Sequence, residues 1–192
     1  MITQLSTVKE RIGIDQFDIK YDGILTNAIK ALSARFDKIC NRKFGRTVNA
    51  LEEFDAGEVE IAPLSYPIES VTKFELKQNE ADGWSEQTGV KYLLRQTCII
   101  SLEKRLALSG LARVTYTGGY VLPGTTVGAG QTALPDDVEQ AAVEQVAAWF
   151  QNRDKLGLIR HWPKGGVYEE FLQAELLIGV RETLKGHERV RI

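Results

Sequence analysis

The side chains that most often perform chemistry in proteins are scarce in this sequence. Its 192 residues include two histidines, His161 and His187, and two cysteines, Cys40 and Cys98. Neither histidine lies near a candidate nucleophile, and nothing lies at metal-ligand spacing from His161. The nucleophile elbow, the zinc-protease helix motif, paired Cys-x-x-Cys, the Walker loop and the calcium loop are absent. We therefore expect no catalytic residue, no cofactor and no metal, in a protein that is not an enzyme.

Two other classes of function stay open. Carboxylates are numerous, and two of them could pair in space as in a glycosidase; such a hydrolase would lose activity when single Asp or Glu residues are replaced. A DNA-binding module could instead use the basic residues of segment 22–43, which are Lys30, Arg35, Lys38, Arg42 and Lys43. No groove-reading motif accompanies these charges, and a solvated or partner-facing helix is a far commoner reason for them. Binding to DNA would weaken steeply with salt.

Composition is that of an ordinary globular chain. Hydrophobic residues make up 43% and charged residues 26%, which allows a sizeable core in one domain. A net charge of −2 gives no global reason to expect nucleic acid or an anionic membrane as partner. We find neither a membrane-spanning apolar run nor a signal peptide. We expect a chain that stays in the cytoplasm where it is made, with both cysteines reduced and buried.

The most strongly patterned segment is an expected helix over 134–153. Pro135, Asp136 and Asp137 are typical of a first helical turn, because proline needs no N–H there and the acids meet the positive end of the dipole. An apolar stripe at helical spacing follows, made of Val138, Ala142, Val146, Trp149 and Phe150, while Gln145 and other polar residues fall on the remaining faces. Further helices are expected at 3–12, 22–43 and 168–185.

From residue 47 to 120 the pattern alternates, which predicts short strands. They are expected at 51–54, 59–61, 71–76, 91–94, 98–102 and 112–116. Because strands follow one another with short links, we expect an antiparallel meander. Trp84 should lie at a hairpin tip or an interface. The Gly-rich loop that follows lacks the Lys-Ser/Thr pair of a phosphate cradle, so we expect a surface excursion.

These segments predict an α+β fold. A helical bundle, made of a short N-terminal helix, a long helix and two C-terminal helices, should carry an antiparallel β-meander inserted between its second and third helices. The whole chain, 1–192, is expected to form one domain. Its parts are N-terminal helices at 1–46, an inserted β region at 47–120, a Gly-rich loop at 121–133, C-terminal helices at 134–185 and a basic tail at 186–192. Such a tail is usually disordered unless something receives it.

Six stretches, taken in order, match a known pattern. They are Thr7–Ile14, Ala34–Phe44, Phe54–Gly57, Tyr66–Val71, Val114–Tyr120 and Leu134–Arg153. In this order they resemble the head–tail connector (adaptor, head-completion) proteins of long-tailed bacteriophages and prophages, over nearly the whole chain. The long strand-rich middle departs from the shortest members of that family, which are almost wholly helical.

The resemblance implies a structural role. Such proteins form a homo-oligomeric ring, typically a dodecamer, beneath the portal protein, and they extend the DNA channel toward a stopper or tail-completion protein. DNA passes through without sequence-specific recognition, and no membrane is involved. The location implied is the head–tail junction of the virion, after assembly in the bacterial host cytoplasm. A nearer rival is a tail-completion or tail-terminator protein, which would bind tail tubes and ignore portals.

The resemblance also implies two sets of contact residues. The C-terminal segment commonly reaches into the portal, so the candidate portal-binding residues are Leu184, Lys185, His187, Arg189, Val190, Arg191 and Ile192. Candidate contacts with a neighbouring subunit or the tail are Trp84, Tyr120, Leu122 and Trp162.

Overall fold

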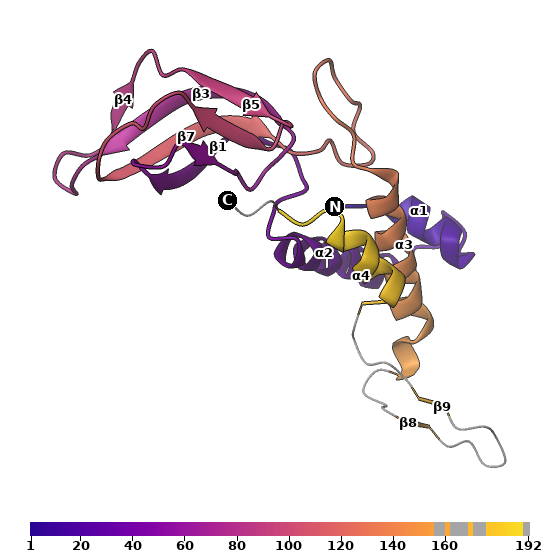
Figure 1. Ribbon diagram of the computed structural model, residues 1–192. Helices are drawn as coiled ribbons and strands as arrows, with labels where there is room; N and C mark the ends of the chain where they lie inside the picture. The colour runs from indigo at the N-terminus through magenta and orange to yellow at the C-terminus, as the bar shows by residue number, and fades with distance from the viewer. Residues whose placement is uncertain (156–159, 162–168, 171–175, 190–192) are drawn as a thin grey trace. The chain divides into compact units, whose positions relative to one another are not determined.

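The computed structural model describes residues 1–155, 160–161, 169–170 and 176–189 (Figure 1). The chain divides into two compact units. The helical unit comprises Met1–Phe36 and Pro135–His187, and the sheet unit comprises Asp37–Leu134 and Glu188–Ile192. The expected α+β class is confirmed, since the described residues form helices and antiparallel sheets. The single domain over 1–192 stays a prediction.

The helical unit is built around α3. Its helices are α1 (Leu5–Ile12), α2 (Asp22–Ile39, of which the part up to Phe36 belongs here), α3 (Asp136–Gln151) and α4 (Ile178–Lys185). Both α1 and α4 pack against α3. The buried apolar side chains of the unit include Val8, Leu25, Ile29, Leu32, Val138, Ala142, Val146, Val180 and Leu184. A short 3-10 helix, Arg153–Lys155, follows α3.

One polar residue of α3 does not lie where its spacing predicts. Gln145 is 1% exposed, although we expected it on an outer face. Its Oε1 accepts the backbone N–H of Leu177 at 2.7 Å, just before α4 begins. The expectation is wrong because α4 covers this side of α3 and leaves a free N–H at its start that the amide satisfies.

A buried lysine organises the connection between α1 and α2. Lys9 is 2% exposed, and its ammonium donates to the carbonyl oxygens of Gln16 at 3.0 Å and Asp18 at 2.8 Å. It also forms an ion pair with Asp22 at 2.5 Å. A buried ammonium is tolerated only when its donors are satisfied, and here they hold the connecting loop against the helix.

Two predicted helices are shorter than expected. The helix expected over 22–43 ends at Ile39, because Asn41 adopts a left-handed φ of 48°. The N–H groups of Asn41 and Arg42 then bond to the carbonyls of Lys38 and Asp37, which closes the helix as a Schellman motif. The helix expected over 168–185 begins only at Ile178.

Part of that last predicted helix is a strand. Strand β9 (Glu169–Glu170) pairs antiparallel with β8 (Arg160–His161). The backbone of Glu169 and Glu170 is therefore engaged across a ladder and not within a helical turn. A short apolar pattern does not distinguish these two states.

The sheet unit contains two antiparallel sheets. The first has the order β1 (Thr47–Asp55), β7 (Leu111–Gly118), β3 (Ile68–Lys77) and β4 (Ser85–Gln87), and the second has the order β2 (Glu60–Ile61), β6 (Ile99–Leu102) and β5 (Tyr92–Arg95). The predicted strands are present, and β4 is additional. The predicted meander is wrong, because a meander pairs strands in sequence order, whereas β7 lies between β1 and β3. From Val114 to Gly118 every residue of β7 is buried, as suits a central strand covered on both faces.

Both sheets contribute to one apolar core. It includes Phe54, Ile61, Ile68, Phe74, Ile100, Leu102, Ala112, Val114 and Tyr116. At the end of β7, a Cβ on Gly118 would lie 2.5 Å from the carbonyl oxygen of Ser65. One on Gly119, whose φ is 103°, would lie 2.6 Å from that of Gly45. A side chain at either position would collide with backbone atoms, so two adjacent glycines are required at the end of β7.

The Gly-rich loop leaves and returns at one point. The N–H of Val121 bonds to the carbonyl of Thr132 at 2.8 Å, and the N–H of Leu134 bonds to the carbonyl of Val121 at 3.0 Å. Residues 124–130 between them are exposed. The loop is a surface excursion with a closed base, as its composition predicts.

Candidate functional site

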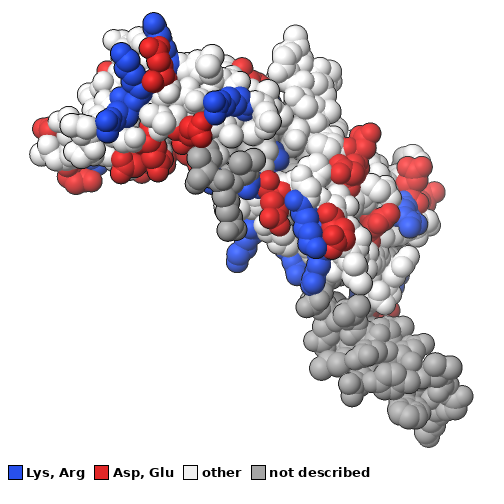
Figure 2. Space-filling model, in the orientation of Figure 1, with Lys and Arg blue, Asp and Glu red and all other residues white. Residues whose placement is uncertain are grey.

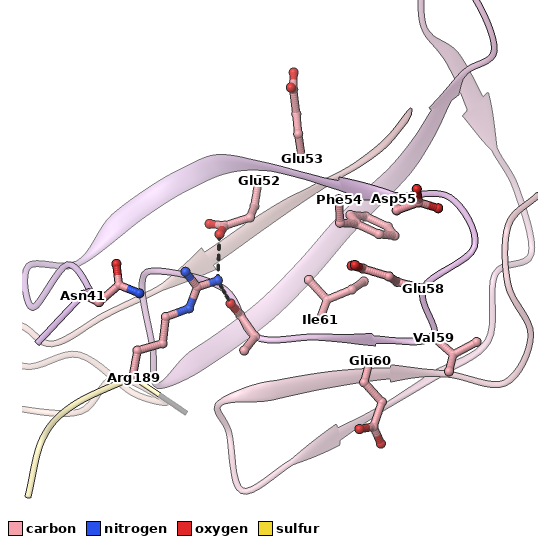
Figure 3. Close-up of a pocket in the computed structure, with 11 residues that line it drawn as sticks. Asn41, Glu52, Glu53, Phe54, Asp55, Glu58, Val59, Glu60, Ile61 and Arg189 are labelled. Atoms are coloured by element: carbon pink, nitrogen blue, oxygen red, sulfur yellow. Dashed lines mark hydrogen bonds and ion pairs between the residues drawn. The ribbon is translucent and has the colours of Figure 1, made fainter. Parts of the chain in front are cut away.

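The sheet unit carries a cleft of about 820 Å³ beside β1. Its wall is made by β1, the turn after β1, β2, and Arg189 from the C-terminal segment (Figure 3). The charged side chains that line it are Glu52, Glu53, Asp55, Glu58, Glu60 and Arg189. The cleft is therefore acidic, with one arginine placed in it.

The arginine is bound by its side chain and by its backbone. Its Nη2 donates to Glu52 Oε1 at 3.1 Å and also to the carbonyl oxygen of Ala62 (Figure 3). Its backbone N–H donates to the carbonyl of Cys40 at 2.8 Å. The side chains of Arg189 and Glu52 are 22% and 14% exposed, so the ion pair is largely removed from water. Such charge-assisted hydrogen bonds are stronger than neutral ones.

Glu52 is held in place independently of the arginine. Its Oε2 accepts the N–H of Leu64 at 3.0 Å and the hydroxyl of Tyr116 at 3.4 Å. Tyr116 is 1% exposed, and burial raises the pKa of its hydroxyl, which keeps it protonated as a donor. Its oxygen in turn accepts the N–H of Ser65 at 3.0 Å. These contacts orient the carboxylate toward a guanidinium.

The other carboxylates of the cleft are arranged differently. Asp55 Oδ1 accepts the N–H of Gly57 at 2.7 Å and shapes the turn. Glu60 pairs with Arg95 at 2.6 Å. Glu53 points to the opposite side of β1 from Glu52 (Figure 3). Taken together, this arrangement favours binding of a cationic side chain.

Sequence reasoning missed Glu52, although a signal was present. Side chains alternate along a strand, so Glu52 shares a face with Phe54, two residues later. Phe54 is buried, which places the carboxylate on the inner face. A carboxylate in that register needs a partner. The identity of the partner, Arg189, could not be predicted, because it lies more than a hundred positions away in the sequence.

One basic residue of the DNA-binding alternative is buried. Arg42 is 3% exposed, and its guanidinium carbon lies 3.4 Å from the ring centroid of Tyr66, 4.8 Å from Phe44 and 5.1 Å from Tyr120. Its Nη2 also donates to the carbonyl of Tyr66. This arginine is packed inside the sheet unit, so its guanidinium cannot reach a phosphate.

The other four basic residues of that set differ from Arg42 in exposure. Lys30, Lys38 and Lys43 are exposed, and Arg35 is partly buried. On the face shown in Figure 2, described Lys and Arg side chains lie among Asp and Glu side chains. A DNA-binding face would gather one sign of charge.

Three of the four interface candidates, Trp84, Tyr120 and Leu122, are partly exposed. Tyr120 stacks on Phe44, with ring centroids 6.4 Å apart and planes 22° apart. Trp84 lies between β3 and β4, 4.2 Å from the guanidinium carbon of Arg113. Leu122 lies at the base of the Gly-rich loop. Trp162 falls outside the described residues. A role in contacts between proteins stays a prediction for all of them.

The candidate portal-binding residues have different environments. Leu184 is fully buried in the helical unit, whereas Lys185 is exposed and pairs with Glu182 at 2.7 Å. His187 lies 2.8 Å from Asp137, and Arg189 occupies the acidic cleft. Val190, Arg191 and Ile192 lie outside the described residues. The tail is therefore held up to Arg189, and the portal role of these residues stays a prediction.

The described cysteines are buried, and the described residues hold no metal cluster. Burial raises the pKa of Cys40 to about 11, so its thiol is neutral and unreactive near pH 7. Both cysteines are buried and unpaired with each other. Among the described residues, no group of three or more His, Cys, Asp or Glu could hold a metal ion. No helix among them has the length and apolar character needed to cross a membrane.

The fold defines a class: an α+β chain with a helical unit and a unit of two antiparallel sheets. No family model matches the sequence, and no curated protein matches it. Solved structures do match. A chain from the neck of an empty GTA particle, computed with C6 symmetry, is 14% identical with a TM-score of 0.60, over 97% of this chain and 89% of that chain.

Two further structures give similar values. A chain in the virion of a native gene transfer agent (GTA) particle is 16% identical, with a TM-score of 0.57, over 97% of this chain and 89% of that chain. A chain in the neck of a native GTA particle, computed with C12 symmetry, is 15% identical, with a TM-score of 0.56, over 98% and 89%. At these identities the match shows a shared fold.

The fold match confirms the resemblance to head–tail connector-type proteins at the level of architecture, since the structural neighbours come from particle necks. The strand-rich middle, which departs from the shortest connectors, is part of the match, because the alignment covers nearly the whole chain.

Proposed function

We propose that this chain is a structural head–tail connector of a phage-like particle. It forms a ring between the portal and the stopper or tail, and it extends the channel through which DNA passes. The observation that carries this proposal is the fold match, which covers 97% of this chain and 89% of a chain from a GTA neck.

The ring is supported by the symmetry of the neighbours. Necks containing similar chains are described with C6 and C12 symmetry. A single chain builds such a ring when one surface patch binds a different patch on the next copy and the rotation closes. A dodecamer in the virion, at the head–tail junction, is the assembly that we propose.

The charge pattern supports passage of DNA without recognition of its sequence. Arg42 is buried among aromatic rings, and charges of both signs mix on the face shown in Figure 2. The net charge is −2. These features suit a channel wall that does not hold its cargo.

The C-terminal segment is the proposed attachment to the portal. Deleting residues 185–192 should abolish co-sedimentation with portal rings from the same phage, while the buried Leu184 and the helical core remain. Circular dichroism and the urea midpoint would show that the deleted chain is folded. Replacing Lys91 by Gln is a matched control, since Lys91 is an exposed lysine outside the tail.

Each outcome of this experiment is decisive. Loss of co-sedimentation in the folded deletion variant supports attachment through the tail. Unchanged co-sedimentation rejects it. A full-length chain that ignores portals and binds tail tubes would support the tail-completion alternative instead.

A further inference from the structure

The acidic cleft already contains the kind of group that it binds. Among its charged lining residues, five are carboxylates and one is an arginine, Arg189. The arginine is not a surface ion pair formed by chance, because its backbone N–H and its guanidinium are both engaged. Two separated attachment points fix the direction in which the segment enters the cleft.

The receiving side is held by contacts that do not involve the segment. Glu52 keeps its orientation through the N–H of Leu64 and the hydroxyl of Tyr116. Neither donor belongs to the C-terminal segment. The carboxylate and the carbonyl of Ala62 therefore present a preformed acceptor pair, and preorganised acceptors lower the cost of binding.

The charge of Arg189 is opposite to that of the five carboxylates that line the cleft. Because the segment is covalently attached, its effective concentration at the cleft is on the order of millimolar. The chain's own segment therefore outcompetes the same segment of a second copy at ordinary protein concentrations.

We propose that the Glu52 cleft is the receptor site for Arg189 of the chain's own C-terminal segment, and that the segment must leave this cleft before a portal takes it. The second half of this statement rests on the proposed connector function. A segment held in its own cleft is available to the portal only for the fraction of time that it is released, so the apparent affinity falls by that fraction.

Hydrogen–deuterium exchange of the full chain tests the first half. In Arg189→Gln, the amide of residue 189 should exchange about tenfold faster than in the unaltered chain, since a charge-assisted hydrogen bond is lost. Arg189→Lys should give an intermediate exchange rate, because lysine keeps the positive charge but lacks the forked pair of N–H donors of a guanidinium. Arg95→Gln is the control, because it removes the same charge from the pair with Glu60 at the same cleft.

Two results would overturn the assignment of the Glu52 cleft as a receptor site. One is exchange in Arg189→Gln at the rate of the unaltered chain. The other is an equal acceleration in Arg95→Gln, which would mean that only overall charge matters.

Glu52→Gln tests release while leaving the tail sequence intact. It should accelerate exchange of the tail and strengthen binding to portal rings by the same factor, again about tenfold. If the tail amides of Glu52→Gln exchange faster but neither this variant nor the unaltered chain binds portals, the connector function is refuted and the cleft assignment stands. Portal binding by the unaltered chain, with exchange unchanged in Glu52→Gln, would refute the cleft assignment and leave the connector function standing.

Discussion

Glu75 in β3 lies between two cations on the first sheet. Arg113 donates to it twice, from Nε at 2.7 Å and from Nη2 at 3.0 Å, and Lys73 lies at 3.0 Å. The hydrogen bonds from Arg113 lower the pKa of Glu75 from 4.5 to about 2. Arg113 also covers Trp84, at 4.2 Å from its ring, so the pair fixes one of the candidate interface aromatics.

This lowered pKa predicts how stability depends on pH. Because the folded pKa lies below the unfolded one, the contribution of Glu75 is fully present above about pH 4.5 and is lost as pH falls toward about 2. Urea unfolding should show Glu75→Gln to be less stable than the unaltered chain at pH 7. The difference should shrink below pH 4.5.

The control for this experiment is Glu86→Gln. Glu86 lies opposite Glu75 in β4, but its side chain is exposed. Its substitution should have little effect at any pH. A stability difference for Glu75→Gln that stays constant from pH 7 to pH 2.5 would contradict the assignment.

Substitution of Arg42 should have a large effect on stability, although the sequence alone suggests an exposed charge at this position. Arg42→Ala should destabilise the protein by about 2–4 kcal/mol, because it empties the space between buried rings and removes cation–π contacts. Lys38→Ala, at an exposed position of the same segment, should change stability by about 0.5 kcal/mol or less. Chemical denaturation measures both, and equal midpoints would show that Arg42 is not structural.

At the scale of elements, two glycines in the N-terminal segment should respond oppositely to one substitution. Gly13 ends α1 with a φ of 72°, whereas Gly23 lies within α2, and a Cβ would meet nothing within 4 Å at either position. Gly13→Ala should cost about 1 kcal/mol through the left-handed backbone. Gly23→Ala should stabilise by about 0.5–1 kcal/mol. Thermal unfolding decides the signs; a shift in the same direction for both would contradict the backbone argument.

Element positions could be predicted from local pattern, and element pairing could not. The helix α3 and most strands follow from apolar spacing, which is a property of consecutive residues. The insertion of β7 between β1 and β3 depends on contacts between residues about forty to seventy positions apart, such as Val71 with Tyr116 and Leu51 with Thr115. Local periodicity contains no information about such pairs.

The candidate site shows the same limit. Strand alternation places Glu52 on an inner face, which could have marked it. Its partner Arg189 lies in a tail whose composition predicts disorder. The tail is ordered up to Arg189 because three hydrogen bonds reach Cys40, Glu52 and Ala62, and none of these contacts is visible in the sequence of the tail.

At the scale of the whole molecule, the described residues contain no metal cluster, and the carboxylate of the cleft holds an arginine. The fold is shared with chains of GTA necks. The assembly into a ring is our proposal, and it rests on this shared fold. A ring also predicts that association depends on protein concentration, which native mass spectrometry over a dilution series measures.

Electron microscopy of the purified protein mixed with portal rings from the same phage tests the proposed role of this chain as a ring-forming connector. We expect a new tier on the portal that has the portal's symmetry and shows which end of the chain docks. Bare portals beside free protein would contradict the claim.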